Sequence, residues 1–293
     1  MTLALLPSPS REAWALGPLT VHWYALCAAI GVLAGLWLTE RRYRAAGGRP
    51  GLVLDLALIA VPAALVGARV QRIILDPQAQ AAVGRDWVEF FRVWDGGLGL
   101  PGALLAVAPV LWWWCRRSQV AAGPLLAAGA PGLALGHAVF VWGYWFTQNW
   151  YGRPSALPWA VQISPLLRVP GYQAYSAFQP LFAYESVWDA VSGLVLIIVI
   201  GRLGLTGDRA LALAAGLVAA GWFWVSLLFG APPRLGGSWG ELGIAFGVAA
   251  VAAAYLMLTG GERGDARLFG VGRRFTRSGF PRPSARSRVG EQP

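Results

Sequence analysis

Charged residues are scarce in this chain. Only 13% of its 293 residues are Asp, Glu, Lys or Arg, whereas 56% are hydrophobic. A soluble domain carries about 25% charged residues, so this composition excludes an ordinary soluble protein. Runs of about 20 apolar residues, the length that crosses a bilayer core, are present instead. We therefore predict an integral membrane protein.

Lysine is absent, and all 24 basic residues are arginine. The glycine cluster at Gly96, Gly97 and Gly99 is not a nucleotide-binding loop, since no strand precedes it and neither Lys nor Ser follows it. The net charge of +10 does not indicate a nucleic-acid partner, because the arginines lie beside apolar runs and in the C-terminal tail. Orientation in the membrane and contact with anionic lipid explain them better.

Cysteine and histidine each occur only twice. Cys27 and Cys115 both fall inside apolar runs, so we expect neither a disulfide nor a catalytic thiol. His22 and His137 have no group of carboxylates or cysteines at ligand spacing along the chain, so no metal site is predicted.

Seven apolar stretches predict seven transmembrane helices and an all-α fold, because a helix satisfies its own backbone hydrogen bonds in lipid. The stretches cover 20–38, 51–75, 97–115, 121–146, 181–201, 210–230 and 238–259. Glycines recur within them, among others at Gly31, Gly35, Gly132 and Gly136. Such spacing lets neighbouring helices approach closely.

Arginines mark one side of the membrane. The first, third and fifth connections and the tail are rich in them, with Arg41, Arg42, Arg44, Arg49, Arg116, Arg117, Arg202, Arg209 and eight more after residue 260. This side is predicted to be cytoplasmic. The N-terminus then lies outside the plasma membrane and the C-terminus inside, which requires an odd number of spans. Arg11 and Glu12 are the only charged residues before the first span and form no basic stretch, so no cleaved signal peptide is expected.

Two connections on the outer side are long. Residues 76–96 include a Trp- and Phe-rich piece that is expected to lie in the membrane interface. Residues 147–180 hold prolines, tyrosines and tryptophans and are predicted to form a small cap on the outer face. The tail, 260–293, is rich in Gly, Arg, Ser and Pro and is predicted to be disordered. Residues 1–259 then form one membrane domain.

Arg69 lies near the outer end of the second predicted span, where a charge is costly and usually faces the protein interior. A guanidinium there can hold a phosphate with paired hydrogen bonds, as a phospholipid site requires. The alternative is an ion pair with Glu185 or Asp189, or extension toward the interface. For the neighbouring Arg72, extension toward the interface is favoured.

Two further polar positions lie on the same side of the membrane. Glu185, with Asp189 one turn later, can accept a proton or orient Arg69, and a structural counter-ion is the alternative. Tyr24, at the outer end of the first span, can hydrogen-bond a lipid headgroup or serve as an ordinary interfacial aromatic residue.

Short motifs follow one another in order between residues 17 and 258. They are Tyr24, Gly67-Ala68-Arg69, Trp94-Asp95-Gly96-Gly97-Leu98-Gly99, Trp142-Gly143 with Trp145-Phe146, Gly152-Arg153-Pro154, Leu157-Pro158-Trp159, and Pro180 with Tyr184-Glu185. In this order and with this number of spans, they resemble the prolipoprotein diacylglyceryl transferase family, most closely its actinobacterial branch.

The resemblance implies an activity and a site. Members of the family transfer the diacylglyceryl group of phosphatidylglycerol to the lipobox cysteine of a secreted precursor, without a metal or soluble cofactor. Phosphatidylglycerol or another anionic phospholipid, and prolipoprotein signal peptides, are the implied partners. The phospholipid-binding residues that the resemblance implies are Arg69, Tyr24, Gly152, Arg153, Tyr184 and Glu185.

The central motif departs from the family pattern. The family has Gly-Arg-x-Gly-Asn-x-x-Asn-x-Glu-x-x-Gly, and the polar positions are occupied in this chain by Val141, Tyr144, Thr147 and Asn149. Trp222 stands at a second arginine position, and Gln179 replaces a histidine. Valine has no side-chain donor and Trp has only its indole N–H. Neither can neutralise a leaving phosphate, so no catalytic residue is assigned.

Three hypotheses follow. We favour a non-catalytic member of the family that binds phospholipid or lipoprotein precursor. The first alternative is an active diacylglyceryl transferase with a rearranged site that uses Arg69 and Arg153. A transporter is the third, but the chain has too few intramembrane charges to line a polar pore.

Overall fold

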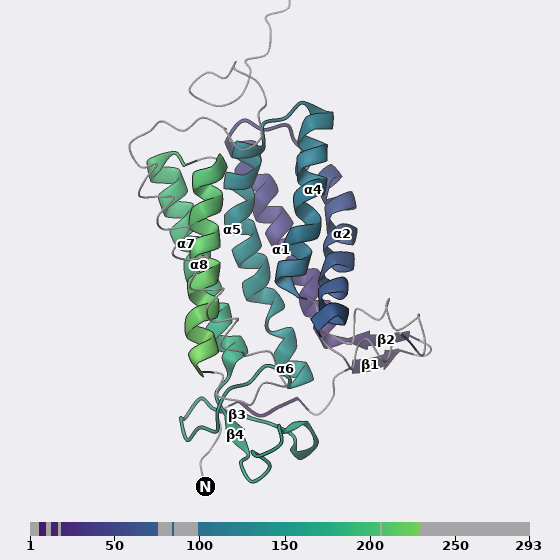
Figure 1. The fold of residues 1–293 in the computed structure, drawn as a ribbon, viewed down its shortest axis with the longest axis vertical. Helices are drawn as coiled ribbons and strands as arrows, with labels where there is room; N and C mark the ends of the chain where they lie inside the picture. The colour runs from purple at the N-terminus through teal and green to yellow at the C-terminus, as the bar shows by residue number, and fades with distance from the viewer. Residues whose placement is uncertain are drawn as a thin grey trace, which may run out of the picture.

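A bundle of long helices forms the body of the molecule (Figure 1). The computed structural model describes residues 6–9, 13–16, 19–75, 84, 99–205 and 207–228. Six long helices lie in these ranges: α1 (Trp23–Ala45), α2 (Leu52–Leu75), α4 (Leu100–Ser118), α5 (Ala122–Phe140), α7 (Leu181–Leu203) and α8 (Gly207–Leu228). The predicted seventh span, nearly all of the 76–96 connection and the predicted disordered tail lie outside the described residues.

Five helical segments are long and apolar enough to cross a membrane, which confirms an integral, multi-pass membrane protein. They are Trp23–Ala45, Leu52–Ile74, Ala122–Thr147, Leu181–Leu203 and Gly207–Val225. Helix α4 was also predicted to span but is not among the five. Its C-terminal half carries three tryptophans at 112–114 followed by Arg116 and Arg117, which makes that half of the helix less apolar.

Helices α1 and α5 pack closely because glycines face one another across their interface. A Cβ atom built on Gly136 would lie 2.8 Å from the carbonyl oxygen of Gly31, and one built on Gly35 would lie 2.8 Å from that of Gly132. No side chain fits at these four positions without moving a backbone. The close approach expected from the glycine spacing is therefore confirmed for this pair.

The predicted cap lies beyond one end of the bundle, next to the short helix α6 (Gly143–Thr147) (Figure 1). It contains β3 (Val161–Gln162), the 3₁₀ turn η3 (Pro165–Leu167) and β4 (Ala177–Phe178), with β3 and β4 antiparallel. The buried hydroxyl of Tyr151 donates to the Leu167 carbonyl and accepts from the Val169 amide, at 2.8 and 2.9 Å. Burial raises the pKa of Tyr151, so the phenol keeps its proton at neutral pH and both bonds persist.

Two short antiparallel strands precede the first span. Strands β1 (Ala13–Leu16) and β2 (Leu19–His22) pair with Ala13 opposite His22 and Leu16 opposite Leu19. The all-α prediction did not include them, and residues 20–22, expected to open the first helix, belong to β2. Alternation of apolar residues over so few positions does not separate a strand from the start of an apolar helix.

Arginines gather at one end of the bundle. The C-terminal turns of α1, α4 and α7 carry the arginines Arg42, Arg44, Arg116, Arg117 and Arg202. The chain reverses direction at each connection, so these turns share the end of the bundle that is opposite the cap (Figure 1). At this end, the guanidinium group of Arg41 lies over the ring of Trp37, and that of Arg116 lies over the ring of Trp112.

Candidate functional site

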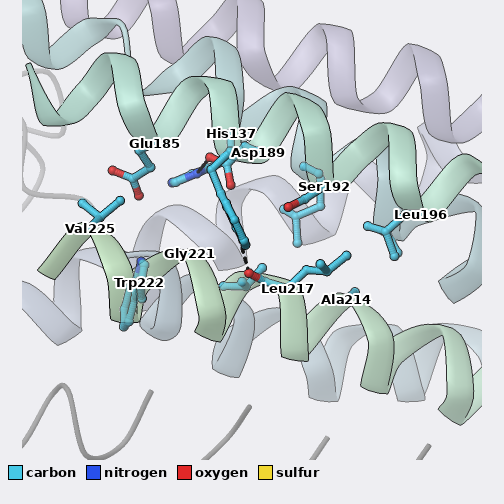
Figure 2. A pocket seen from close by; sticks show the side chains of 15 residues that line it. His137, Glu185, Asp189, Ser192, Leu196, Ala214, Leu217, Gly221, Trp222 and Val225 are labelled. Atoms are coloured by element: carbon cyan, nitrogen blue, oxygen red, sulfur yellow. Dashed lines mark hydrogen bonds and ion pairs between the residues drawn. The ribbon is translucent and has the colours of Figure 1, made fainter. Parts of the chain in front are cut away.

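A pocket opens between α5, α7 and α8 (Figure 2). Most of its lining is apolar. Its polar lining residues are His137 from α5 and Glu185, Asp189 and Ser192 from α7. Trp222 on α8 also lines it. None of the fifteen lining residues, all of them described, is an arginine.

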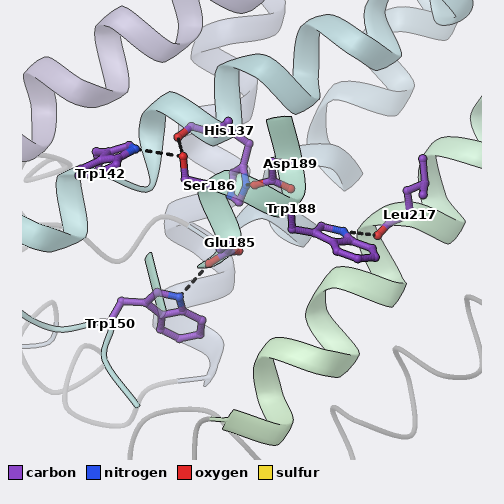
Figure 3. Close-up of polar contacts among 9 residues, drawn as sticks. His137, Trp142, Trp150, Glu185, Ser186, Trp188, Asp189 and Leu217 are labelled. Atoms are coloured by element: carbon purple, nitrogen blue, oxygen red, sulfur yellow. Dashed lines mark hydrogen bonds and ion pairs between the residues drawn. The ribbon is translucent and has the colours of Figure 1, made fainter. Parts of the chain in front are cut away.

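Two carboxylates and one imidazole meet in this pocket. The His137 Nδ1 atom lies 2.7 Å from the Asp189 Oδ2 atom, and Glu185 is one helical turn before Asp189 on α7. The indole N–H of Trp150, from the cap, donates to Glu185 Oε2 at 2.8 Å (Figure 3). The expectation of no metal site did not take this cluster into account. It considered only spacing along the chain, whereas α5 and α7 bring together residues 52 positions apart.

Indole N–H groups form hydrogen bonds between the segments around the pocket. Trp142 donates to the Ser186 hydroxyl at 3.0 Å, and Ser186 in turn donates to the carbonyl of Ala138 at 2.8 Å (Figure 3). Trp188 donates across to the Leu217 carbonyl on α8 at 2.9 Å. These bonds fix α7 between α5 and α8, so the carboxylates on α7 are held in register with His137.

Besides Glu185, three of the six predicted lipid-binding residues lie close to the junction of α7 with the cap. Tyr184 accepts the indole N–H of Trp159 at 2.8 Å. Gly152 is buried, and a Cβ atom there would lie 2.8 Å from the carbonyl oxygen of Leu228. The side chain of Arg153 is exposed. Gly152 thus allows a close approach of cap to α8, while Arg153 points away from the packed interior.

Tyr24 and Arg69 belong to other parts of the bundle. Tyr24 is buried on α1, where its ring packs against Phe140 and Tyr144 at centroid distances of 5.4 and 5.7 Å. Arg69 is only 8% exposed and belongs to α2, which packs on α4 and α1, whereas α7 packs on α5 and α8. Of the six residues, only Glu185 lines the pocket between α5, α7 and α8.

Comparison with known proteins identifies the family of this chain. The family model described as prolipoprotein diacylglyceryl transferase matches residues 11–230. The chain belongs to this family. A Streptomyces coelicolor protein named phosphatidylglycerol–prolipoprotein diacylglyceryl transferase 1 is 43% identical over 230 residues, covering 78% of this chain and 66% of that protein. A Cutibacterium acnes protein of the same name, without the number, is 38% identical over 80% of this chain and 79% of its own length.

The match spans about two thirds of the length of two Streptomyces relatives, at 66% each. A second Streptomyces coelicolor protein, phosphatidylglycerol–prolipoprotein diacylglyceryl transferase 2, is 38% identical over 223 residues. That organism therefore has two diacylglyceryl transferase relatives of this chain. The resemblance stated from the motifs is confirmed.

The two family arginine positions have different surroundings in this member of the diacylglyceryl transferase family. Val141 has no exposed surface and lies where α5 ends, in a turn tightened by the Tyr144 amide bonding to the Val141 carbonyl at 3.1 Å. Trp222 lines the pocket beside the two carboxylates. The motif positions Thr147 and Asn149 bond to each other at 3.0 Å instead of to the pocket.

Replacing Trp150 with Phe is expected to loosen the cap. The substitution keeps the aromatic ring but removes the donor to a buried carboxylate, and such a bond contributes about 1.5–3 kcal/mol. Thermal unfolding in detergent should show a midpoint lower by about 3–10 °C. Trp159→Phe is the matched control, because its indole bonds a neutral hydroxyl and the side chain is 47% exposed. Equal shifts in the two variants would contradict the assignment.

Proposed function

We propose that this chain is a non-catalytic member of the prolipoprotein diacylglyceryl transferase family that binds phospholipid or lipoprotein precursor. The observation that carries the proposal is the lining of the pocket between α5, α7 and α8. It presents Glu185 and Asp189, with His137 as the one cationic candidate among the described lining residues. A leaving phosphate in that pocket would meet like charge, and like charges repel strongly where water is scarce.

Diacylglyceryl transfer needs positive charge, not negative charge, around the leaving phosphate. Charge develops on the leaving phosphate, and fixed donors or cations must stabilise it in a site that excludes water. Val141 is buried and aliphatic, and Trp222 offers one N–H. Neither position where the family motif has arginine therefore supplies a positive charge: Trp222 lines the pocket without one, and Val141 is not among its lining residues.

We place lipid binding outside this pocket, at Arg69. Arg69 is nearly buried near the C-terminus of α2, at the same end of the bundle as the cap. A guanidinium in that position suits the phosphate of an anionic phospholipid, and the names of the relatives point to phosphatidylglycerol as the lipid. The same names include prolipoprotein, and the signal peptide of such a precursor is the second partner that we propose.

The alternative is an active transferase with a rearranged site. It is favoured by identities of 38–43% to relatives that carry the transferase name. It requires Arg69 and Arg153 to reach one phosphate. Arg153 is exposed in the cap, so its side chain would have to turn inward.

We also propose seven spans in the plasma membrane, with the N-terminus outside and a cytoplasmic C-terminal tail. The arginine-rich helix ends lie together opposite the cap, which supports a cytoplasmic position for that end and an outer position for the cap. Residues 238–259 then supply the seventh span of a membrane domain covering 1–259, followed by the basic tail at 260–293.

The proposal is tested with purified protein in nanodiscs that contain phosphatidylglycerol and phosphatidylethanolamine. Native mass spectrometry should show retained phosphatidylglycerol, and Arg69→Gln should reduce it about tenfold, because charge-assisted bonds to a phosphate are lost. Arg72→Gln, at an exposed position on the same helix, should change it less than about twofold. Retention that is unchanged by Arg69→Gln would contradict the lipid site, and thioether product on an added lipobox peptide would contradict the absence of catalysis.

A further inference from the structure

Three ligand atoms converge at the wall of the pocket between α5, α7 and α8. One atom each from His137, Glu185 and Asp189 lies within 4.8 Å of the other two. Figure 2 shows the three side chains side by side, with the Glu185 carboxylate directed toward the space between α7 and α8. The group is built on two packed helices, so its geometry is fixed by the bundle and not by a loop.

The two carboxylates have acceptor capacity that the protein does not use. Glu185 and Asp189 are 7% and 8% exposed. Trp150 donates to one oxygen of Glu185, and His137 contacts one oxygen of Asp189. Within the described part of the chain, no donor reaches the second oxygen of either carboxylate. Both residues line the pocket, so these oxygens are available to whatever occupies it.

Charge balance favours a divalent cation as that occupant. Two ionised carboxylates with a protonated imidazole leave one negative charge in a mostly apolar pocket, and an unpaired buried charge is strongly disfavoured. Two ionised carboxylates with a neutral imidazole and a divalent cation leave none. The metal then replaces the proton between His137 and Asp189, which is released to solvent.

We propose that His137, Glu185 and Asp189 form a three-ligand site for a divalent transition metal, with Zn²⁺ as the best match. Zn²⁺ accepts imidazole nitrogen and carboxylate oxygen together, whereas Mg²⁺ and Ca²⁺ prefer all-oxygen ligands. The cavity leaves a fourth position for water or a small ligand. Trp150 serves as an outer-shell donor that orients Glu185. This inference bears on the proposed function, because a bound divalent cation would cancel the negative charge that otherwise repels a leaving phosphate; the thioether assay is therefore run with both metal-stripped and Zn²⁺-loaded protein.

Cobalt is a direct probe, because Co²⁺ in a low-coordinate protein site absorbs visible light. Full-length protein without a histidine tag is stripped with chelator and titrated with Co²⁺, and Zn²⁺ content is measured by elemental analysis after reloading. About one metal per chain is expected. His137→Gln should weaken Co²⁺ binding at least about 100-fold, and Trp150→Phe about 10-fold, as expected for an outer-shell partner.

His22→Gln is the matched control, because His22 is the only other histidine in the chain and is not a lining residue of the pocket. Its affinity for Co²⁺ should equal that of the unmodified protein. If His137→Gln does not fold, Asp189→Asn tests the same ligand set with a side chain of nearly unchanged shape. Failure of the folded, unmodified protein to bind Co²⁺ or Zn²⁺, or equal binding by His137→Gln and His22→Gln, overturns the proposal.

Discussion

Thioether formation by this protein is expected to be at least about 10³-fold slower than by Streptomyces coelicolor transferase 1 assayed in parallel. Removing one group that stabilises developing charge costs about 10²–10³ in rate. Two such positions are changed, and deletions within one site combine less than additively, which makes about 10³ a conservative bound. The assay follows transfer of labelled diacylglyceryl from phosphatidylglycerol to a lipobox peptide in detergent.

A strain lacking its own transferase gives the second readout. Expression of this chain should not restore lipid attachment to a lipobox cysteine, although the protein should reach the membrane in normal amount. Trp222→Arg alone should not restore it either, because the new guanidinium would lie beside Glu185 and Asp189 and pair with them. Restoration by the unmodified chain, followed by its loss in Arg69→Ala, would establish the rearranged active site instead.

The helical fold follows from the sequence because each span carries its own signal. Apolar runs of sufficient length report on contact with lipid, and each helix satisfies its own backbone, so no long-range information is needed. The boundaries of α2, α7 and α8 fall within a few residues of the predicted 51–75, 181–201 and 210–230. The pairing of α1 with α5 was not predictable, because glycine spacing shows that a helix can approach another but not which one.

The polar cluster was harder to predict because its members are far apart in sequence. Glu185 and Asp189 were recognised as candidates, and Arg69 on α2 was considered as one alternative partner, whereas the partners in the structure are Trp150 and His137. One signal was available: His137 is a lone titratable residue within an otherwise apolar span, and such residues usually face a polar partner inside the protein.

The largest loss of stability is expected when methyl groups are added to the interface between α1 and α5. In the double variant Gly132→Ala/Gly136→Ala, each added methyl group meets backbone atoms of α1, at 2.6 Å from Gly35 O and 2.8 Å from Gly31 O. Backbone cannot rotate away as a side chain can, so the helices must separate. Overpacking costs about 1–3 kcal/mol at each site, and the unfolding midpoint in detergent should fall by about 5–20 °C.

Gly129→Ala on the same helix separates packing from helix propensity. A Cβ atom at Gly129 has only Thr39 Cγ2 nearby, at 3.9 Å, which is an ordinary van der Waals contact. Alanine favours a helix over glycine by about 1 kcal/mol, so Gly129→Ala should leave the midpoint unchanged or raise it. Alanine brings the same gain in helix propensity at positions 132 and 136. A lower unfolding midpoint in the double variant can therefore come only from the lost close approach of α1 and α5. Stabilisation by the double variant would show that α1 and α5 are not held at this distance in the membrane protein.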